Sequence, residues 1–238
     1  MSDRKTAVVL GVGPGLGMSI AQRFGKEGYA VAVVSRSADR HAGYVGELAA
    51  NGIEAAAFVA DVNDPAQLRS ALDAIDDRFG GIDVVYFGPA GTGGFPKDLT
   101  TITVDDVRVA MDIVYPAVDT VSVVLPRMLE RGAGALLFGG GISGQIPMPM
   151  LGQLVLPSAA LRQYVLTLHE VLAPKGVYAG ILTIGGVVER GDIHTMISGA
   201  PERFGNLAGH TLNPDEIADE AWALFTDRKG AEATFSAL

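Results

Sequence analysis

The sequence of 238 residues contains no cysteine. This absence excludes disulfide bonds, a cysteine nucleophile and cysteine-ligated metal sites, and we predict no metal site of any kind. Positive charge is also scarce, because 18 lysines and arginines stand against 27 aspartates and glutamates, for a net charge of −9. Nucleic acid is therefore not expected as a partner.

The first residues lack the layout of a secretory signal, and no long uninterrupted apolar segment follows them. We therefore expect a cytoplasmic protein without a membrane partner. Hydrophobic residues make up 48% of the chain and charged residues 19%. This is the balance of a folded globular protein rather than of a disordered one.

Short apolar runs alternate with segments of helical spacing along the whole chain. This alternation predicts a parallel sheet with helices on both faces. We predict a single α/β domain over residues 1–238, with a doubly wound (Rossmann) sheet of seven strands at 7–10, 30–35, 54–59, 83–87, 135–138, 177–184 and 231–236. Long helices are expected at 103–131 and 157–173.

The first strand is followed by four alternate glycines, Gly11, Gly13, Gly15 and Gly17, and then by a helical segment. Strand, glycine turn and helix form half of a mononucleotide-binding unit, in which bare backbone and the helix N-terminus receive a pyrophosphate. A glycine-rich turn that binds nothing is the alternative. Leu16 stands where the common GxGxxG fingerprint needs its last glycine, so the pattern is instead G-x-x-x-G-x-G.

This spacing, together with the order of the segments after it, resembles the short-chain dehydrogenase/reductase family over nearly the whole chain. The resemblance implies oxidoreductase chemistry with a nicotinamide dinucleotide. The candidate cofactor-binding residues are Gly11, Gly13, Gly15, Leu16, Gly17, Ser35, Arg36, Asp61, Val62, Gly88, Ala90, Gly91, Gly186 and Val188.

The second strand ends in Ser35 and Arg36, whereas a chain specific for NAD(H) usually has an acidic residue there to bind the ribose 2′-hydroxyl. Because a guanidinium pairs with a 2′-phosphate, we predict NADP(H) in preference to NAD(H). A solvated surface arginine is the alternative. For Asp61, the resemblance implies a hydrogen bond to adenine, but an aspartate that only starts the loop to the next helix explains it equally well.

The catalytic side chains of the family are missing from this sequence. The resemblance implies a serine after the fifth strand and, 13 residues later, Tyr-x-x-x-Lys, whose tyrosine exchanges a proton with the substrate oxygen. Aligned through the flanking residues, this chain has Gly141, Leu154 and Ser158 in those places, and Asp112 where the long helix normally has an asparagine. The usual carbonyl reduction is therefore not expected to proceed by the usual proton relay.

Two polar residues are the candidates for catalysis. Asp112 is expected to face the pocket, where burial would raise its pKa and suit it to act as an acid; the alternative is that it binds backbone N–H groups of its own helix. Ser143 either replaces the missing serine or is a turn serine between glycines. The rest of the pocket is predicted to be apolar and to take an apolar small molecule, with a lining of Phe95, Met148, Met150, Leu154, Val188 and Met196.

Three functions remain open on this evidence. They are an atypical NADP(H)-dependent oxidoreductase, a non-redox enzyme on the same fold, and a catalytically inactive nucleotide- or ligand-binding regulatory protein. The helix expected at 103–131 is apolar on two faces, which indicates a second packing partner besides the sheet. The resemblance implies that this partner is another subunit, in a homodimer or homotetramer.

Overall fold

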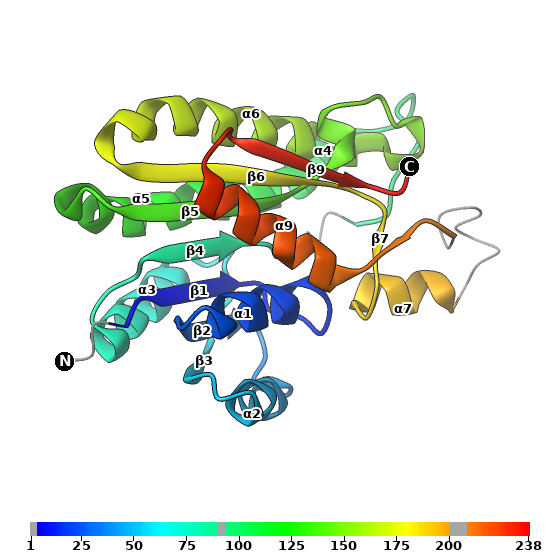
Figure 1. Ribbon diagram of the computed structural model, residues 1–238. Helices are drawn as coiled ribbons and strands as arrows, with labels where there is room; N and C mark the ends of the chain where they lie inside the picture. Colours follow the sequence, from blue (N-terminus) through cyan, green and yellow to red (C-terminus); the bar gives the residue numbers. More distant parts are fainter. Residues whose placement is uncertain (1–3, 90–93, 200–208) are drawn as a thin grey trace.

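The structure is a computed structural model that describes residues 4–89, 94–199 and 209–238. Its centre is a sheet of seven parallel strands in the order β3-β2-β1-β4-β5-β6-β9, which confirms the predicted fold class (Figure 1). The strands are β1 (Thr6–Leu10), β2 (Ala30–Ser35), β3 (Ala55–Val59), β4 (Val84–Phe87), β5 (Gly134–Gly141), β6 (Val177–Gly185) and β9 (Glu232–Ser236). The strand order reverses between β1 and β4, which is where folds of this type bind ligands, at the carboxyl ends of the strands.

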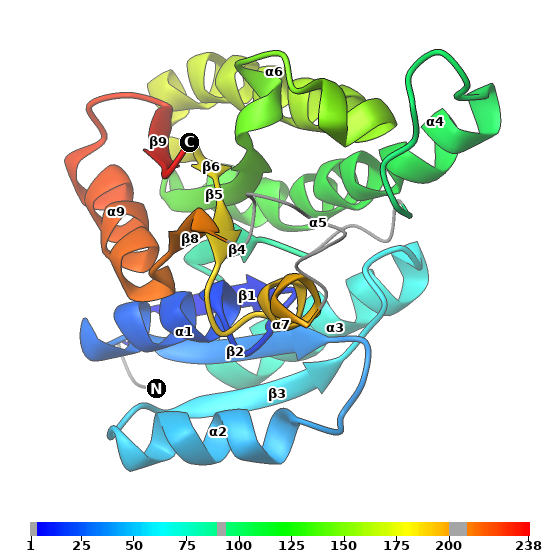
Figure 2. The ribbon, with the colours of Figure 1, turned by 90° about the vertical axis from the view of Figure 1, so that its right-hand side faces the viewer.

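Helices cover both faces of the sheet (Figures 1 and 2). One face packs against α1 (Leu16–Lys26), α2 (His41–Ala50) and α9 (Pro214–Asp227). The other packs against α3 (Pro65–Phe79), α5 (Val114–Arg131) and α6 (Val155–Leu172). Two short helices, α4 (Val104–Ala110) and α7 (Asp192–Ser198), lie toward the carboxyl ends of the strands, and Figure 2 shows α7 in front of that edge.

The central strands are buried on both faces. In β1, Val8 and Leu10 belong to the core beneath α3, α5 and α6, whereas Ala7 and Val9 belong to the core beneath α1 and α9. A strand covered on both sides needs apolar residues at every position, so it appears in the sequence as a continuous apolar run rather than as an alternation. This explains why the short runs identified the strands to within one residue at each end, except at the end of β5, which continues to Gly141.

The helix expected at 103–131 is interrupted by a 3₁₀ turn, η1 (Met111–Ile113), between α4 and α5. The cause is Pro116, which has no N–H to donate to the carbonyl of Asp112 four residues earlier. Thr103 caps α4 through a capping box with Asp106, as its sequence indicated. The break changes the direction in which Asp112 points, and this matters for the site below.

The segment Val104–Arg131 is long and apolar enough, by length and composition alone, to span a membrane, contrary to the expectation that no long apolar segment would occur. Its apolar character has a local explanation. Ala117, Val121, Val124 and Met128 are buried against the sheet, as in the core helix of a globular fold.

Three further features were not predicted. A second, two-stranded parallel sheet joins β7 (Val187–Val188) to β8 (Thr211–Leu212). Besides η1, 3₁₀ turns form at η2 (Ile142–Gly144), η3 (Pro149–Leu154) and η4 (Ala173–Lys175). Strand β5 continues through its three glycines and pairs with β6 as far as Gly141, because bare backbone still supplies the hydrogen bonds of a ladder.

Candidate functional site

The glycine turn lies at the carboxyl end of β1 and is shaped by close backbone contacts. Gly11 has a φ of +83°, and a Cβ atom there would lie 2.4 Å from the Cα of Pro89. A Cβ at Gly17 would lie 2.8 Å from the Cα of Val12, where α1 packs on its own turn. Both positions therefore require glycine for backbone conformation or close approach.

The N-terminus of α1 fits an anionic group. The helix begins at Leu16, no described side chain caps it, and its first turn holds no acidic residue. Its first N–H groups are thus free to bind an anion, and the helix dipole favours one. A Cβ at Gly13 would meet no atom within 4 Å, so bare backbone faces open space beside these N–H groups. The turn has the properties required to hold a pyrophosphate.

The turn opens into a cleft of about 410 Å³. Besides the glycine loop, the cleft is lined by Gly88, Gly186 and Val188 from the ends of the neighbouring strands, and by the first residues of α7. The segment before α7 touches the glycine loop, since a Cβ at Gly15 would lie 2.9 Å from the carbonyl oxygen of Glu189.

A second cavity of about 410 Å³ adjoins this cleft. The two share a set of lining residues, which are Leu16, Gly88, Gly141, Ser143, Leu151, Ile184 and Ile193. Most of the second cavity is apolar, with Leu154 and Leu161 from η3 and α6 and Ile113 from η1 among its walls. A dinucleotide in the cleft would therefore reach a mainly apolar chamber.

The three positions aligned with the family's catalytic residues all line this second cavity. A Cβ at Gly141 would lie 3.2 Å from Ser158 Oγ and 3.6 Å from Ser143 Oγ. Ser158 Oγ donates a hydrogen bond to the Leu154 carbonyl oxygen at 3.1 Å. The three aligned positions thus lie around one cavity, and their side chains offer a hydroxyl and a hydrocarbon where the resemblance implies an ammonium and a phenol.

Ser143 lies in η2, directly after β5, and lines both the cleft and the cavity. It is only 8% exposed, and its Oγ has no hydrogen-bond partner among the described residues. A buried hydroxyl without a partner costs about 1–3 kcal/mol, so such groups are normally satisfied. Ser143 lies two residues after Gly141, the position at which the resemblance implies a serine. It is therefore the serine nearest in sequence to the one that is missing.

Asp112 does not have the environment predicted for it. Its side chain is exposed, whereas Ala110 and Ile113 of the same segment line the cavity. The 3₁₀ turn rotates residue 112 away from the site. The prediction of a buried carboxyl facing the pocket is therefore wrong, and its alternative is not observed either, because Asp112 makes no side-chain hydrogen bond within the described parts of the chain.

The residues predicted at the adenosine end lie around the end of β2. Ser35 Oγ donates to the Ser37 carbonyl oxygen at 3.0 Å and lies 2.7 Å from His41 Nε2, and the Arg36 side chain is exposed. Asp61 accepts a hydrogen bond from the Asn63 N–H, as expected of an aspartate that starts a loop. Val62 is buried in the core, and Ala90 and Gly91 lie outside the described residues.

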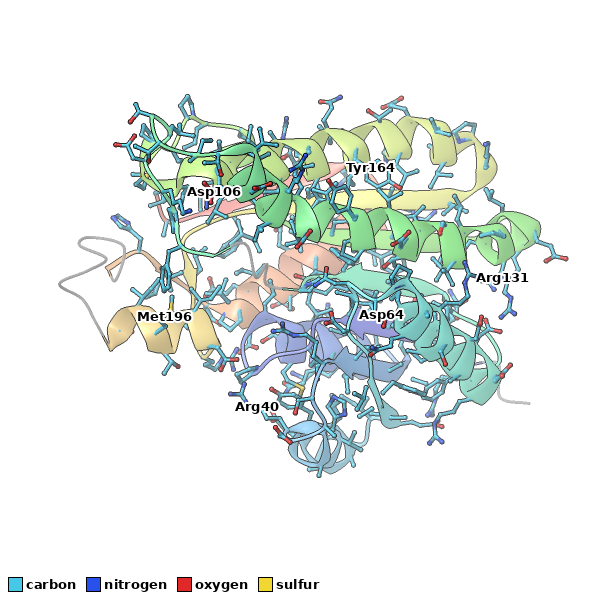
Figure 3. All side chains as sticks on the ribbon, turned by 180° about the vertical axis from the view of Figure 1, so that it is seen from behind. Arg40, Asp64, Asp106, Arg131, Tyr164 and Met196 are labelled. Atoms are coloured by element: carbon cyan, nitrogen blue, oxygen red, sulfur yellow. The ribbon has the colours of Figure 1, made fainter. Side chains whose placement is uncertain are left out.

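The apolar lining was predicted in part. Met148, Leu154 and Val188 line the cleft or the cavity, whereas Phe95, Met150 and Met196 are exposed and line neither (Figure 3 labels Met196). The walls are formed instead by aliphatic residues that were not part of the predicted apolar lining, namely Leu16, Ile113, Leu151, Leu161, Ile184 and Ile193.

Two further residues were missed. Gln153 is buried, and its side chain accepts a hydrogen bond from the Lys97 N–H and donates one to the Phe95 carbonyl oxygen, which fixes the segment after β4 against η3. Tyr86 of β4 is buried and lines the cavity. Burial raises the pKa of its phenol above the usual value.

Ion pairs connect α7 and the residue just before it to α2 and α9. Arg40, at the start of α2, donates to both carboxylate oxygens of Asp192 at 2.9–3.0 Å (Figure 3 labels Arg40). Arg190, just before α7, pairs with Asp215 of α9 at 2.7 Å. No cluster of potential metal ligands occurs among the described residues.

A family model described as short chain dehydrogenase matches residues 5–194. The chain belongs to the short-chain dehydrogenase family of oxidoreductases. Within this family it is 29% identical over 230 residues to 1-deoxy-11-beta-hydroxypentalenate dehydrogenase of Streptomyces avermitilis, which covers 94% of this chain and 82% of that protein.

Two solved structures share the fold. L-sorbose reductase from Gluconobacter frateurii, in complex with NADPH and L-sorbose, gives a TM-score of 0.84 at 22% identity and covers 98% of this chain and 95% of its own. A short chain oxidoreductase from Pseudomonas aeruginosa PAO1, described as containing an atypical catalytic center, gives 0.83 at 21% identity, with 98% and 96% covered.

Proposed function

We propose that the protein is an NADP(H)-dependent oxidoreductase that acts on an apolar small molecule without the family's tyrosine–lysine proton relay. Its family membership supports the reaction class. The observation that carries the proposal is the Ser143 hydroxyl, buried and without a described partner at the junction of the glycine-loop cleft and the apolar cavity. A hydroxyl in that position is suited to bind the oxygen of a substrate.

The cleft supports a dinucleotide. Its glycine turn and the open N-terminus of α1 suit a pyrophosphate. The exposed guanidinium of Arg36, together with the absence of an acidic residue at Ser35–Arg36, favours a 2′-phosphate and hence NADP(H) over NAD(H). L-sorbose reductase, which shares the fold, was solved with NADPH. When bound, the cofactor supplies or accepts a hydride.

The chain's own residues then have limited roles. Ser143 Oγ binds and orients the substrate oxygen, and the aliphatic walls exclude water. Leu154 has no proton to give, and the Ser158 hydroxyl cannot replace a lysine ammonium. Since a positioned acid or base contributes about 10²- to 10⁴-fold, ordinary ketones should react very slowly. The proton must come from water, or the substrate must require none during hydride transfer.

A second function remains a candidate, namely a catalytically inactive nucleotide- or ligand-binding protein. The observation in its favour is that no aspartate, glutamate, histidine, lysine or arginine is among the described residues that line the second cavity. A non-redox enzyme on this fold is less well supported, because most such chemistry needs an acid–base group in that place.

We also propose that the protein assembles into a homodimer or homotetramer through α5 and α6. The outer faces of these helices carry exposed apolar side chains, including Tyr115, Val118, Leu156 and Val171. Apolar side chains on neighbouring helices favour a protein partner. A stable monomer in light scattering at micromolar concentration would contradict this assembly.

Calorimetry with NADPH and NADH tests the cofactor, and NADPH oxidation followed at 340 nm over a panel of apolar carbonyl and conjugated compounds tests the activity. We expect NADPH to bind more tightly than NADH, and Ser143→Ala to lower kcat/KM about threefold to tenfold, the worth of one hydrogen bond. Ser122→Ala, at an exposed serine of α5, is the matched control. Binding of NADPH without oxidation on any substrate would favour the inactive binding protein.

A further inference from the structure

We propose that the substrate is a neutral quinone, a flat conjugated carbonyl compound whose reduced oxygen is an acidic hydroxyl, and that the Tyr86 phenol is a second hydrogen-bonding group for it beside Ser143. This inference rests on the proposed function and specifies its substrate class. It follows from which polar atoms the cavity holds, and from where Tyr86 lies.

The described lining of the cavity contains three polar side chains, and all three are hydroxyls: Tyr86, Ser143 and Ser158. No charged side chain is among the described residues of that lining, so nothing described there would neutralise a carboxylate or a phosphate on a ligand. Hydroxyl groups in an apolar chamber suit a neutral compound with carbonyl acceptors. This favours a neutral carbonyl compound over an acid, a sugar phosphate or an acyl carrier.

Tyr86 occupies space that two glycines leave free. A Cβ at Gly88 would lie 2.3 Å from Tyr86 Cε1, and a Cβ at Gly139 would lie 2.8 Å from the Tyr86 hydroxyl oxygen. The phenol thus lies between the ends of β4 and β5, at the floor of the cavity. Its hydroxyl makes no hydrogen bond to any described residue, so it is a second hydroxyl available to a ligand in the chamber that Ser143 also lines.

The Tyr86 hydroxyl is suited to bind an oxygen and unsuited to replace the family's catalytic acid. Burial raises the pKa of Tyr86, so the phenol keeps its proton at neutral pH and donates a hydrogen bond. No lysine is among the described residues that line the cavity, so no ammonium is placed there to lower this pKa. The substrate must therefore tolerate a reduced oxygen that is not protonated during hydride transfer.

A quinone meets this requirement and an ordinary ketone does not. Reduction of a ketone produces an alkoxide, whereas reduction of a quinone produces a phenolate, a far weaker base whose conjugate acid has a pKa of about 10. The phenolate is thus far easier to form without an acid. The quinone accepts a hydride from the reduced nicotinamide, which leaves oxidised. One carbonyl oxygen gains the O–H bond, the other becomes the phenolate, and water then protonates it to give the hydroquinone.

The test compares menadione, a bicyclic quinone, with 1-tetralone, a bicyclic ketone of similar size. We expect the enzyme to oxidise NADPH at least 100-fold faster with menadione than with 1-tetralone, after subtraction of a protein-free blank. Because no protein group titrates in the step, kcat should change less than twofold between pH 6 and pH 8. Equal rates with the two compounds, or a kcat that follows a single ionisation in this range, would overturn the inference.

Binding provides a readout that does not depend on turnover. Menadione is titrated by calorimetry into the nucleotide-free protein and into its NADP⁺ complex. We expect Tyr86→Phe, which keeps the ring in place, to raise the Kd for menadione about fivefold to tenfold. Tyr178→Phe is the matched control, because this buried tyrosine of β6 does not line the cavity and its hydroxyl donates to the Gly230 carbonyl oxygen; it should leave the Kd unchanged.

The outcomes separate this inference from the function on which it rests. If NADPH does not bind, both fail. If NADPH binds and is oxidised by other compounds but menadione neither binds nor reacts, the quinone assignment alone fails. If menadione reacts and Tyr86→Phe binds it as tightly as the wild type, the role of Tyr86 is overturned.

Discussion

Replacing Gly13 by alanine should separate nucleotide binding from folding. Gly13 lines the cleft, its φ lies outside the left-handed region, and a Cβ there would meet no protein atom within 4 Å. The added methyl group therefore costs no strain in the folded protein. Loss of glycine from the unfolded chain is expected to stabilise the variant slightly, by about 0.4–1 kcal/mol.

The same methyl group would point into the space that a pyrophosphate needs beside the N-terminus of α1. Displacing the phosphate enough to lose one charge-assisted hydrogen bond costs about 1.5–3 kcal/mol, which corresponds to a Kd for NADPH about tenfold to a hundredfold higher. The other glycines of the turn do not give this separation. Alanine at Gly11 or Gly17 would clash with backbone and would lower stability as well.

Thermal unfolding and calorimetry on the same samples provide the assay. The matched control is Gly46→Ala in α2, where a Cβ also meets nothing within 4 Å and no cleft is near. We expect both variants to unfold at or above the wild-type Tm, and only Gly13→Ala to bind NADPH weakly. An unchanged Kd for Gly13→Ala would refute the assignment of this turn as the pyrophosphate site.

Three further expectations follow from individual side chains. Arg36→Ala should remove the preference for NADPH over NADH, with a loss of more than tenfold in NADPH affinity seen by calorimetry; a retained preference would locate the 2′-phosphate elsewhere. Asp112→Asn should leave kcat unchanged, because the side chain is exposed, and a clear fall in kcat would contradict that geometry. Burial raises the pKa of Glu232, but hydrogen bonds from Arg162, Thr183 and Gln145 outweigh it and hold the pKa below its usual value. Its stabilisation is thus present above the unfolded-state pKa of about 4.5 and is lost as the pH falls through the lower folded-state pKa. Glu232→Gln should lower the Tm by several degrees at pH 7 and flatten its decline in acid, and an unaltered acid limb in calorimetric scans would show that another group controls it.

The fold could be predicted because the central strands are buried on both faces. A continuous apolar run such as Ala30–Val34 identifies its strand without knowledge of its neighbours, and the intervening helices force parallel connections. The nucleotide turn was equally accessible, since glycine spacing is a local property. Aligning Ser158 with the family's lysine position also placed Gly141 and Leu154 at one cavity. The reason is that the number of residues between β5 and α6 determines which residues meet there.

The content of the site was harder to predict, since it depends on packing rather than on spacing. Asp112 would face the pocket in a continuous helix, but Pro116 breaks that helix beside it. In the sequence, Tyr86 does not differ from the other apolar residues of its strand. The position of its ring depends on the space that Gly88 and Gly139 leave because they lack side chains. These glycines lie 51 residues apart and meet only in the folded sheet.

That empty space leads to a final prediction about how Tyr86 and Gly88 depend on each other. A Cβ at Gly88 would lie 2.3 Å from Tyr86 Cε1, so the Tyr86 ring fills the volume that a side chain at position 88 would need. Gly88→Asn alone should destabilise the protein by about 1–3 kcal/mol, because the new Cβ would overlap the ring. Tyr86→Val alone should cost about 2–5 kcal/mol by leaving a cavity. In the double variant the asparagine occupies the vacated volume, so the combined loss of stability in urea titrations should fall at least 1 kcal/mol short of the sum of the two. Additive losses of stability would show that the Tyr86 ring and a side chain at position 88 do not compete for the same volume, and would refute this reasoning.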